Sequence, residues 1–253
     1  MTSMATDIKV VDDITDISRT AADIILQQIR TTLLTKELFS LALSGGSTPL
    51  NLYSLLARDK AYRGQIPWEK IHFFWGDERH VPPDHSDSNF LLASGSIFSH
   101  VPIPQKNIHR MPVAESDAGV VAKIYEKELK DFFQFQEGRL PRFNCILLGM
   151  GTDGHTASLF PGTEALHKKG RLVVPNWVAK LQVNRITMTV PLINHADLII
   201  FLVSGEEKAE MLHNVIEGKR NPDLYPAQSI QPVHGKLVWI VDSAAASCLG
   251  SNL

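Results

Sequence analysis

The chain has 253 residues, of which 44% are hydrophobic and 21% charged, and its formal net charge is −2. This composition is typical of globular proteins and excludes whole-chain disorder or a disulfide scaffold. The near-neutral charge argues against nucleic acid as a partner, because phosphate backbones are bound by basic surfaces. No apolar run approaches the ~18–20 residues of a spanning helix, so we expect no membrane association.

Apolar residues at three- and four-residue spacing indicate helices, and short continuous apolar runs indicate strands. In chain order they predict a helix at 13–36, a strand at 38–43, a helix starting after Thr48, a strand at 71–75, a short helix at 89–97, a helix at 118–133, strands at 143–148, 172–178, 185–190 and 197–203, a helix after 203 and a strand at 237–241.

Two of these helix starts carry capping signals. Thr48 followed by Pro49 matches an N-cap and a first helical residue, and Ser204-Gly205-Glu206-Glu207 matches a capping box. Strands that are apolar throughout and alternate with helices indicate a buried parallel sheet. The sequence therefore predicts one α/β domain over residues 1–253, with an open, mostly parallel, Rossmann-like sheet and helices on both faces.

The two cysteines, Cys145 and Cys248, have neither CxxC nor metal-type spacing, so we expect both to be reduced and structural. The first seven residues lack the basic and apolar segments of a signal peptide. We therefore expect a cytoplasmic protein, and a monomer, because no surplus apolar helix is evident.

Three clusters rich in glycine and polar residues follow predicted strands, at residues 44–49, 76–80 and 149–162. Ligands of open α/β sheets bind at the carboxyl ends of the strands, so we expect the clusters to form one site. The residues of the first cluster that we assign to phosphate are Ser44, Gly45, Gly46, Ser47 and Thr48. Its glycines allow close approach and its helix N-terminus favours an anion, although a tight turn without a ligand has the same pattern.

The other clusters supply candidate catalytic groups. His155 lies in a turn with four glycines and can exchange a proton near neutral pH as a general base, unless it is a structural histidine. Asp153 or Asp77 would orient it. Arg79 can hold a phosphate in its planar fork, or can belong to a solvated turn.

Further charges and histidines give weaker signals. Arg185 begins a predicted strand, and Lys208 lies in the first turn of a helix, where the dipole disfavours a cation unless an anionic ligand compensates. Each alone is consistent with a surface charge. Two prolines separate His80 from His85, so no metal site is predicted there.

Taken together, four segments resemble the 6-phosphogluconolactonases in order and spacing, over roughly residues 15–245. They are Ser44 to Pro49, Gly76-Asp77-Glu78-Arg79, Gly151 to Gly162 and Arg185-Ile186-Thr187. Glucosamine-6-phosphate deaminases share the sheet and a similar Asp-Gly-His segment, which in them typically continues into Asn-Glu-Pro. Here Ser158-Leu159-Phe160-Pro161 stands instead, as in the lactonases.

The resemblance implies a deaminase-type fold and hydrolysis of the sugar-phosphate lactone 6-phospho-D-glucono-1,5-lactone, the second step of the oxidative pentose phosphate pathway. We expect no cofactor and no metal, because the motif offers one histidine rather than three ligands. It also implies phosphate contacts for Arg185 and Lys208, with Arg79 as a third cation. Two other functions stay open: a sugar-phosphate deaminase or isomerase, and a phosphosugar-binding regulator without catalysis.

Overall fold

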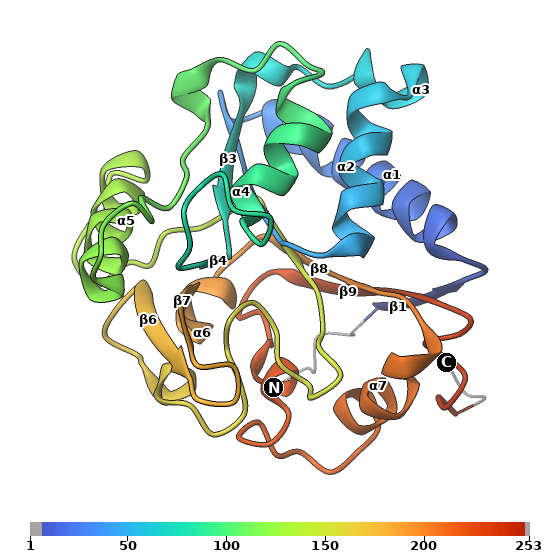
Figure 1. The fold of residues 1–253 in the computed structure, drawn as a ribbon. Helices are drawn as coiled ribbons and strands as arrows, with labels where there is room; N and C mark the ends of the chain where they lie inside the picture. The colour runs from blue at the N-terminus through green and yellow to red at the C-terminus, as the bar shows by residue number, and fades with distance from the viewer. Residues whose placement is uncertain (1–6, 251–253) are drawn as a thin grey trace.

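The computed structural model describes residues 7–250, so the first six residues, where no signal peptide is expected, and the last three lie outside the described part (Figure 1). Its main element is a six-stranded sheet in the order β1-β9-β8-β5-β2-β3. Every pair of neighbours in this sheet is parallel. The strands are β1 (Asp7–Val11), β2 (Phe39–Leu43), β3 (Ile71–Trp75), β5 (Cys145–Leu148), β8 (Leu198–Val203) and β9 (Lys236–Asp242).

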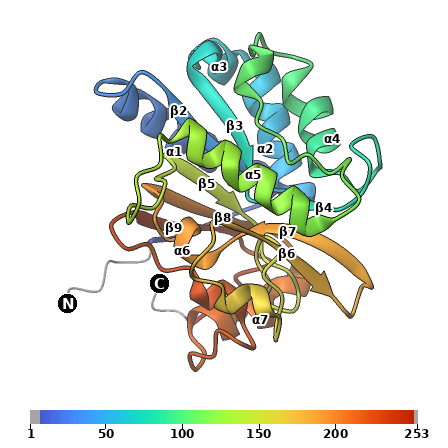
Figure 2. The same ribbon diagram turned by 90° about the vertical axis from the view of Figure 1, so that its left-hand side faces the viewer.

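Helices cover both faces of this sheet, as predicted. The helices are α1 (Ile14–Leu33), α2 (Ser47–Arg58), α3 (Lys60–Arg63), α4 (Asn89–Ala93), α5 (Ala118–Phe132), α6 (Val190–Ile193) and α7 (Ala209–Ile216). In Figures 1 and 2, α1 and α2 lie on one side of the sheet, and α6 and α7 lie on the other. β2 and β8 are buried at every residue because both faces are covered. The edge strand β1 was not predicted, because it is partly exposed throughout.

A second, three-stranded sheet in the order β4-β7-β6 is antiparallel. Its strands are β4 (Asp77–Arg79), β6 (Val173–Val178) and β7 (Val183–Met188). The strands expected at 172–178 and 185–190 are therefore present, but they lie outside the parallel sheet. Only residues 179–182 separate these strands, and a parallel pair needs a long crossover. The alternating exposure of β6 also fits a sheet with one solvated face.

The two sheets are joined at Gly76, between β3 and β4. Its N–H donates to the Leu43 carbonyl at 3.0 Å, which extends the parallel sheet, and its carbonyl accepts from the Met188 N–H at 2.8 Å, which extends the antiparallel one. The residues after β3 therefore pass directly from one sheet into the other.

Both predicted capping signals are wrong in detail. Helix α2 begins at Ser47, with Gly46 as its N-cap at φ +109°, so Thr48 and Pro49 lie inside the first turn. At the other site, the Ser204 hydroxyl and the Gly205 N–H both bind the Asp242 carboxylate instead of capping a helix. A 3₁₀ turn at 206–208 then precedes α7. In each case a glycine with positive φ directly precedes the first helical turn, which is the start of α2 after Gly46 and the 3₁₀ turn after Gly205.

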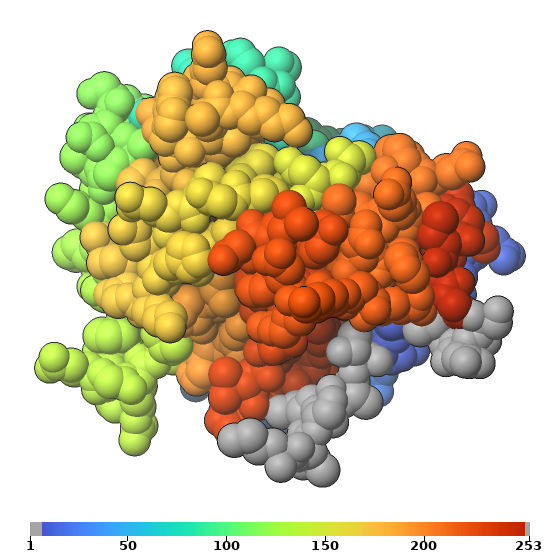
Figure 3. All heavy atoms as spheres, turned by 90° about the horizontal axis from the view of Figure 1, so that it is seen from below, coloured from blue at the N-terminus to red at the C-terminus, as the bar shows by residue number. Residues whose placement is uncertain are grey.

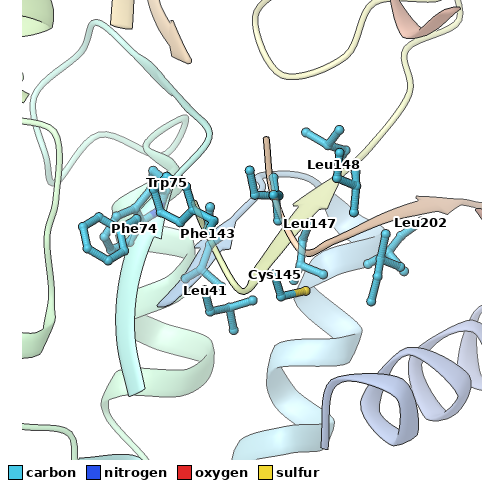
Figure 4. Packing of buried hydrophobic residues seen from close by; sticks show 14 of the residues in the cluster. Leu41, Phe74, Trp75, Phe143, Cys145, Leu147, Leu148 and Leu202 are labelled. Atoms are coloured by element: carbon cyan, nitrogen blue, oxygen red, sulfur yellow. The ribbon is translucent and has the colours of Figure 1, made fainter. Parts of the chain in front are cut away.

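The core lies between the sheet and its helices, and Figure 4 shows part of it around β5. Phe74 packs edge-on against Phe143, with ring centroids 5.2 Å apart, and Cys145 is fully buried beside them. Within residues 7–250, no helix is both long and apolar enough to cross a membrane.

The cysteines differ in their surroundings, which predicts different reactivities. Cys145 is buried, and burial raises the pKa of its thiol, whereas Cys248 is exposed. We expect a disulfide-exchange reagent such as DTNB to titrate a single thiol in the native protein, because the thiolate is the reactive form. The second thiol should react only in denaturant. Cys248→Ser should abolish the native reaction, and a fast reaction left in that variant would contradict the buried position of Cys145.

Candidate active site

The three clusters meet in space, as predicted, because β5, β2 and β3 are neighbours and end on the same edge of the sheet. Residues from all three line a hollow of about 210 Å³, which we call the loop hollow. A second hollow of about 270 Å³, the hairpin hollow, adjoins it and is lined partly by β7 and the turn before it. Asp77, Arg79, His155 and Ala157 line both hollows.

His155 is held by Asp153, two residues earlier in the same turn. Its Nδ1 lies 2.5 Å from Asp153 Oδ1, and its ring stacks on Phe160 with centroids 4.1 Å apart. The hydrogen bond from His155 is the main reason that the pKa of Asp153 falls to about 2. The Lys180 ammonium, 3.7 Å from Asp153 Oδ2, acts in the same direction. Nε2 of His155 has no hydrogen-bond partner among the described residues.

Two glycines make this turn possible. A Cβ on Gly151 would stand 2.1 Å from His155 Nδ1, so a side chain there would displace the imidazole. Gly154 has φ +77°, which L-residues rarely adopt, and its carbonyl accepts from the Ala227 N–H at 2.9 Å. The N–H groups of Gly151 and Gly154 are themselves bonded within the turn, so they are not free to stabilise an oxyanion.

Asp77 occupies a different place from Asp153. It begins β4, and its Oδ2 accepts from the Ser158 hydroxyl at 2.7 Å, with both residues buried. Of the two acids proposed to orient His155, Asp153 is therefore the one that contacts the imidazole. Asp77 lines both hollows beside it.

Arg79 and Arg185 face each other across β4 and β7, as register partners. The Arg79 Nη1 donates to the Asp87 carbonyl at 2.6 Å, but the Nε atoms of both arginines are buried without a partner among residues 7–250. Burial, and then the charge of Arg79, lower the pKa of Arg185. Two neighbouring guanidinium groups with unused donors favour an anion between them.

The loop after β2 forms the opposite wall. The Ser44 N–H donates to the Tyr53 hydroxyl at 2.9 Å, and that hydroxyl donates to the Ser44 carbonyl at 2.7 Å, which fixes the loop to α2. Ser44, Gly45 and Gly46 line the loop hollow together with Lys208. Lys208 forms no ion pair within the part of the chain that the structure describes.

The predicted phosphate residues are thus not all brought together. Ser47 and Thr48 lie in the first turn of α2 and line neither hollow. Arg185 lines only the hairpin hollow and Lys208 only the loop hollow, with Arg79 between them.

Several site residues were not predicted. Phe160 supports the imidazole, Ser158 holds Asp77, Lys180 approaches Asp153, and Asn89 lines the loop hollow. Phe160 and Ser158 belong to the motif around His155, but a sequence motif does not show which side chains stack or pair. Asn89 gave no signal beyond a place in a predicted short helix.

A wider hollow of about 780 Å³ is lined by Phe160 but not by His155. It shares Asp153, Phe160 and Lys180 with the hairpin hollow. Figure 3 shows this face, where the yellow segment around 150–180 lies against the orange-red segment around 210–235. Its lining lacks His155 and both arginines, so we place the chemistry in the two smaller hollows.

No group of three or more His, Cys, Asp or Glu side chains within residues 7–250 is arranged to hold a metal ion. His80 Nε2 binds the Glu115 carbonyl at 2.7 Å, and His85 Nδ1 lies 3.9 Å from Asp87, so the two histidines point to separate partners.

Metal independence follows as a prediction. Dialysis against EDTA should leave unchanged the initial rate of hydrolysis of the lactone that the sequence resemblance implies, because the site offers one imidazole rather than the three ligands of a catalytic zinc. Protein dialysed without chelator is the control. A loss of rate that one particular divalent ion restores would contradict this expectation.

Comparison with known proteins agrees with this geometry. The family model for glucosamine-6-phosphate isomerases/6-phosphogluconolactonase matches residues 12–239. The chain belongs to this family. It is 43% identical over 241 residues to a 6-phosphogluconolactonase of Nostoc sp., covering 95% of this chain and 97% of that protein. It is 47% identical over 214 residues to a 6-phosphogluconolactonase of Synechocystis sp., covering 85% and 84% of the two chains.

Solved structures of the family agree. The 6-phosphogluconolactonase from Trypanosoma cruzi is 31% identical, with a TM-score of 0.86, over 98% of both chains. A monomeric glucosamine-6-phosphate deaminase, 22% identical with a TM-score of 0.78, has the same fold. The family, fold class and enzyme class expected from the sequence are confirmed.

Proposed function

We propose that this chain hydrolyses 6-phospho-D-glucono-1,5-lactone to 6-phospho-D-gluconate, with His155 as general base, in the second step of the oxidative pentose phosphate pathway. The observation that carries the proposal is the Asp153–His155 pair, which shares the hairpin hollow with two arginines whose guanidinium donors are partly unused. An imidazole beside an anion site suits a phosphorylated ester. The substrate is the one named by the family relatives.

The reaction needs a nucleophilic water and a proton for the departing ring oxygen. His155 takes a proton from water at Nε2, and the imidazolium then gives that proton to the leaving oxygen. Asp153 remains ionised, since its pKa is about 2, and it accepts from Nδ1–H. It thereby fixes the tautomer and stabilises the imidazolium, as the acid of a hydrolase triad does.

The phosphate group lies beside Arg79, the cation common to both hollows. Arg185 reaches it from the hairpin hollow, and Lys208 reaches it from the loop hollow. The N–H groups of Gly45 and Gly46, which make no hydrogen bond within the described residues, add donors at the start of α2. Helix N-termini with free N–H groups favour phosphate.

The test is the initial rate of hydrolysis of freshly generated 6-phosphogluconolactone, with the no-enzyme rate subtracted because the lactone opens spontaneously. We expect rapid turnover, and no release of ammonia from glucosamine 6-phosphate. Tight binding of the phosphosugar without turnover would favour a regulator, and ammonia release would favour a deaminase. Either result would overturn the proposal.

A further inference from the structure

Asn89 connects two walls of the loop hollow. It is the first residue of α4 and is 2% exposed. Its Nδ2 donates to the Asp77 carbonyl at 2.9 Å, and its N–H donates to Glu78 Oε1 at 2.8 Å. The Glu78 carboxylate also accepts from the N–H groups of Arg79 and Phe90, so the start of α4 is tied to β4.

The other end of the Asn89 amide meets the loop after β2. Its Oδ1 is buried and has no hydrogen-bond partner among residues 7–250. A Cβ built on Gly45 would lie only 1.9 Å from this oxygen. The amide therefore fills the space beside Gly45, and the backbone approaches this closely only because residue 45 has no side chain.

We propose that Asn89 is a positioning residue, which holds the Ser44–Gly46 loop at a fixed distance from β4. The loop N–H groups and the Arg79 guanidinium then face the same phosphate. Asn89 acts through Gly45 and Asp77 and stays away from the reacting carbonyl. The inference rests on the proposed function and adds to it a determinant of phosphate affinity.

The chain provides a matched control in Asn107. This asparagine is also buried, its Nδ2 donates to the Glu69 and Ile71 carbonyls at 2.9 and 3.1 Å, and its Oδ1 likewise has no partner among the described residues. It lies at the opposite end of β3, where that strand begins. Removing it should lower stability as much as removing Asn89 does, without touching the site.

The first comparison uses Asn89→Ala and Asn107→Ala. We expect Asn89→Ala to raise KM for the lactone at least about tenfold while kcat changes less than about threefold, the pattern of lost ground-state binding. The protection that inorganic phosphate gives against thermal unfolding should weaken in parallel. Asn107→Ala should lower Tm similarly and leave both readouts unchanged. An unchanged KM in Asn89→Ala, or an equal rise in both variants, would overturn the proposal.

The second comparison tests the contact itself. Gly45→Ala forces a methyl against Asn89 Oδ1 and should also raise KM, whereas Gly95→Ala, with nothing within 4 Å of the new Cβ, should not. In the double variant Gly45→Ala/Asn89→Ala the methyl has room, so KM should be no higher than in Asn89→Ala alone. Effects that multiply independently would show that the two residues are not coupled, and would overturn the inference.

These outcomes are separable from failure of the proposed function. If the unmodified protein does not hydrolyse the lactone, the proposed function fails, but protection by inorganic phosphate still reports on the loop. Gly45→Ala removes no buried side chain, so it gives a second reading if Asn89→Ala does not fold. Undiminished phosphate protection in Gly45→Ala would then overturn the role of Asn89.

Discussion

Replacing His155 by Asn is expected to lower kcat for lactone hydrolysis by about 10²–10⁴-fold, the usual contribution of a general base. The fold should survive, because the side chain is partly exposed and Asn is polar and smaller. Initial rates above the spontaneous reaction, together with Tm, measure the two effects. A variant that keeps more than about a tenth of the activity would show that His155 is not the base.

The acid side of the pH profile tests the same assignment. Activity should fall in the acid range above the pKa of Asp153, because a protonated imidazole at residue 155 cannot accept a proton from water. Asp153, with a pKa of about 2, stays ionised throughout that range, so its protonation cannot cause this loss. We expect the low-pH fall to be absent from the residual activity of His155→Asn. The same fall in that variant would assign it to another group.

Removing the phosphate from the substrate is expected to lower kcat/KM by several orders of magnitude. A charge-assisted hydrogen bond contributes roughly 1.5–3 kcal/mol, and the proposed phosphate site offers several such donors, from Arg79, Arg185, Lys208 and the loop N–H groups. These contacts lie away from the lactone carbonyl, so their binding energy can also position it against His155. Initial rates with gluconolactone beside 6-phosphogluconolactone measure the difference. Comparable kcat/KM values would contradict a phosphate site in these hollows.

Arg185→Ala should reduce the difference in kcat/KM between the phosphorylated and the unphosphorylated lactone. The variant should impair the phosphorylated lactone far more than the unphosphorylated one, which never used the contact. Arg185→Lys should recover only part, since the ammonium keeps the charge but loses the planar fork. Arg142, which pairs with Asp197 at 2.5 Å outside the site, provides the control. Arg142→Ala should leave the ratio of the two substrates' kcat/KM values unchanged. An unchanged ratio in Arg185→Ala would remove Arg185 from the phosphate site.

The meeting of the three clusters at the candidate site could be predicted from the sequence because it follows from topology. Clusters after strands must gather at one sheet edge when those strands are parallel neighbours, and β5, β2 and β3 are. The second sheet was not predicted, because the composition of β6 and β7 indicates strands in either arrangement and the length of their connection was not weighed. Only the short connection at 179–182 distinguishes a hairpin from a crossover.

The partners of individual side chains could not be predicted from the sequence, for a different reason. Asp153 and Asp77 were equal candidates to orient His155, and the choice depends on which carboxylate the turn brings within hydrogen-bond distance. The contact of Asn89 with Gly45 joins segments that are distant in the chain. No local spacing encodes a distance of that kind. Gly45 was recognised as a site residue from the sequence, but Asn89, whose closeness requires a glycine there, was not.

The join between the two sheets has a consequence for how this architecture can diversify. The imidazole is carried by the parallel sheet, and both arginines by the antiparallel one. The proposed base and the two proposed phosphate-binding arginines therefore lie on different sheets, which meet at the Gly76 peptide, while the Ser44–Gly46 loop belongs to the parallel sheet. Mutations in the β6–β7 hairpin can change substrate specificity and leave the hydrogen bonds of the parallel sheet intact. Such mutations must preserve the two hydrogen bonds by which the Gly76 peptide joins the sheets.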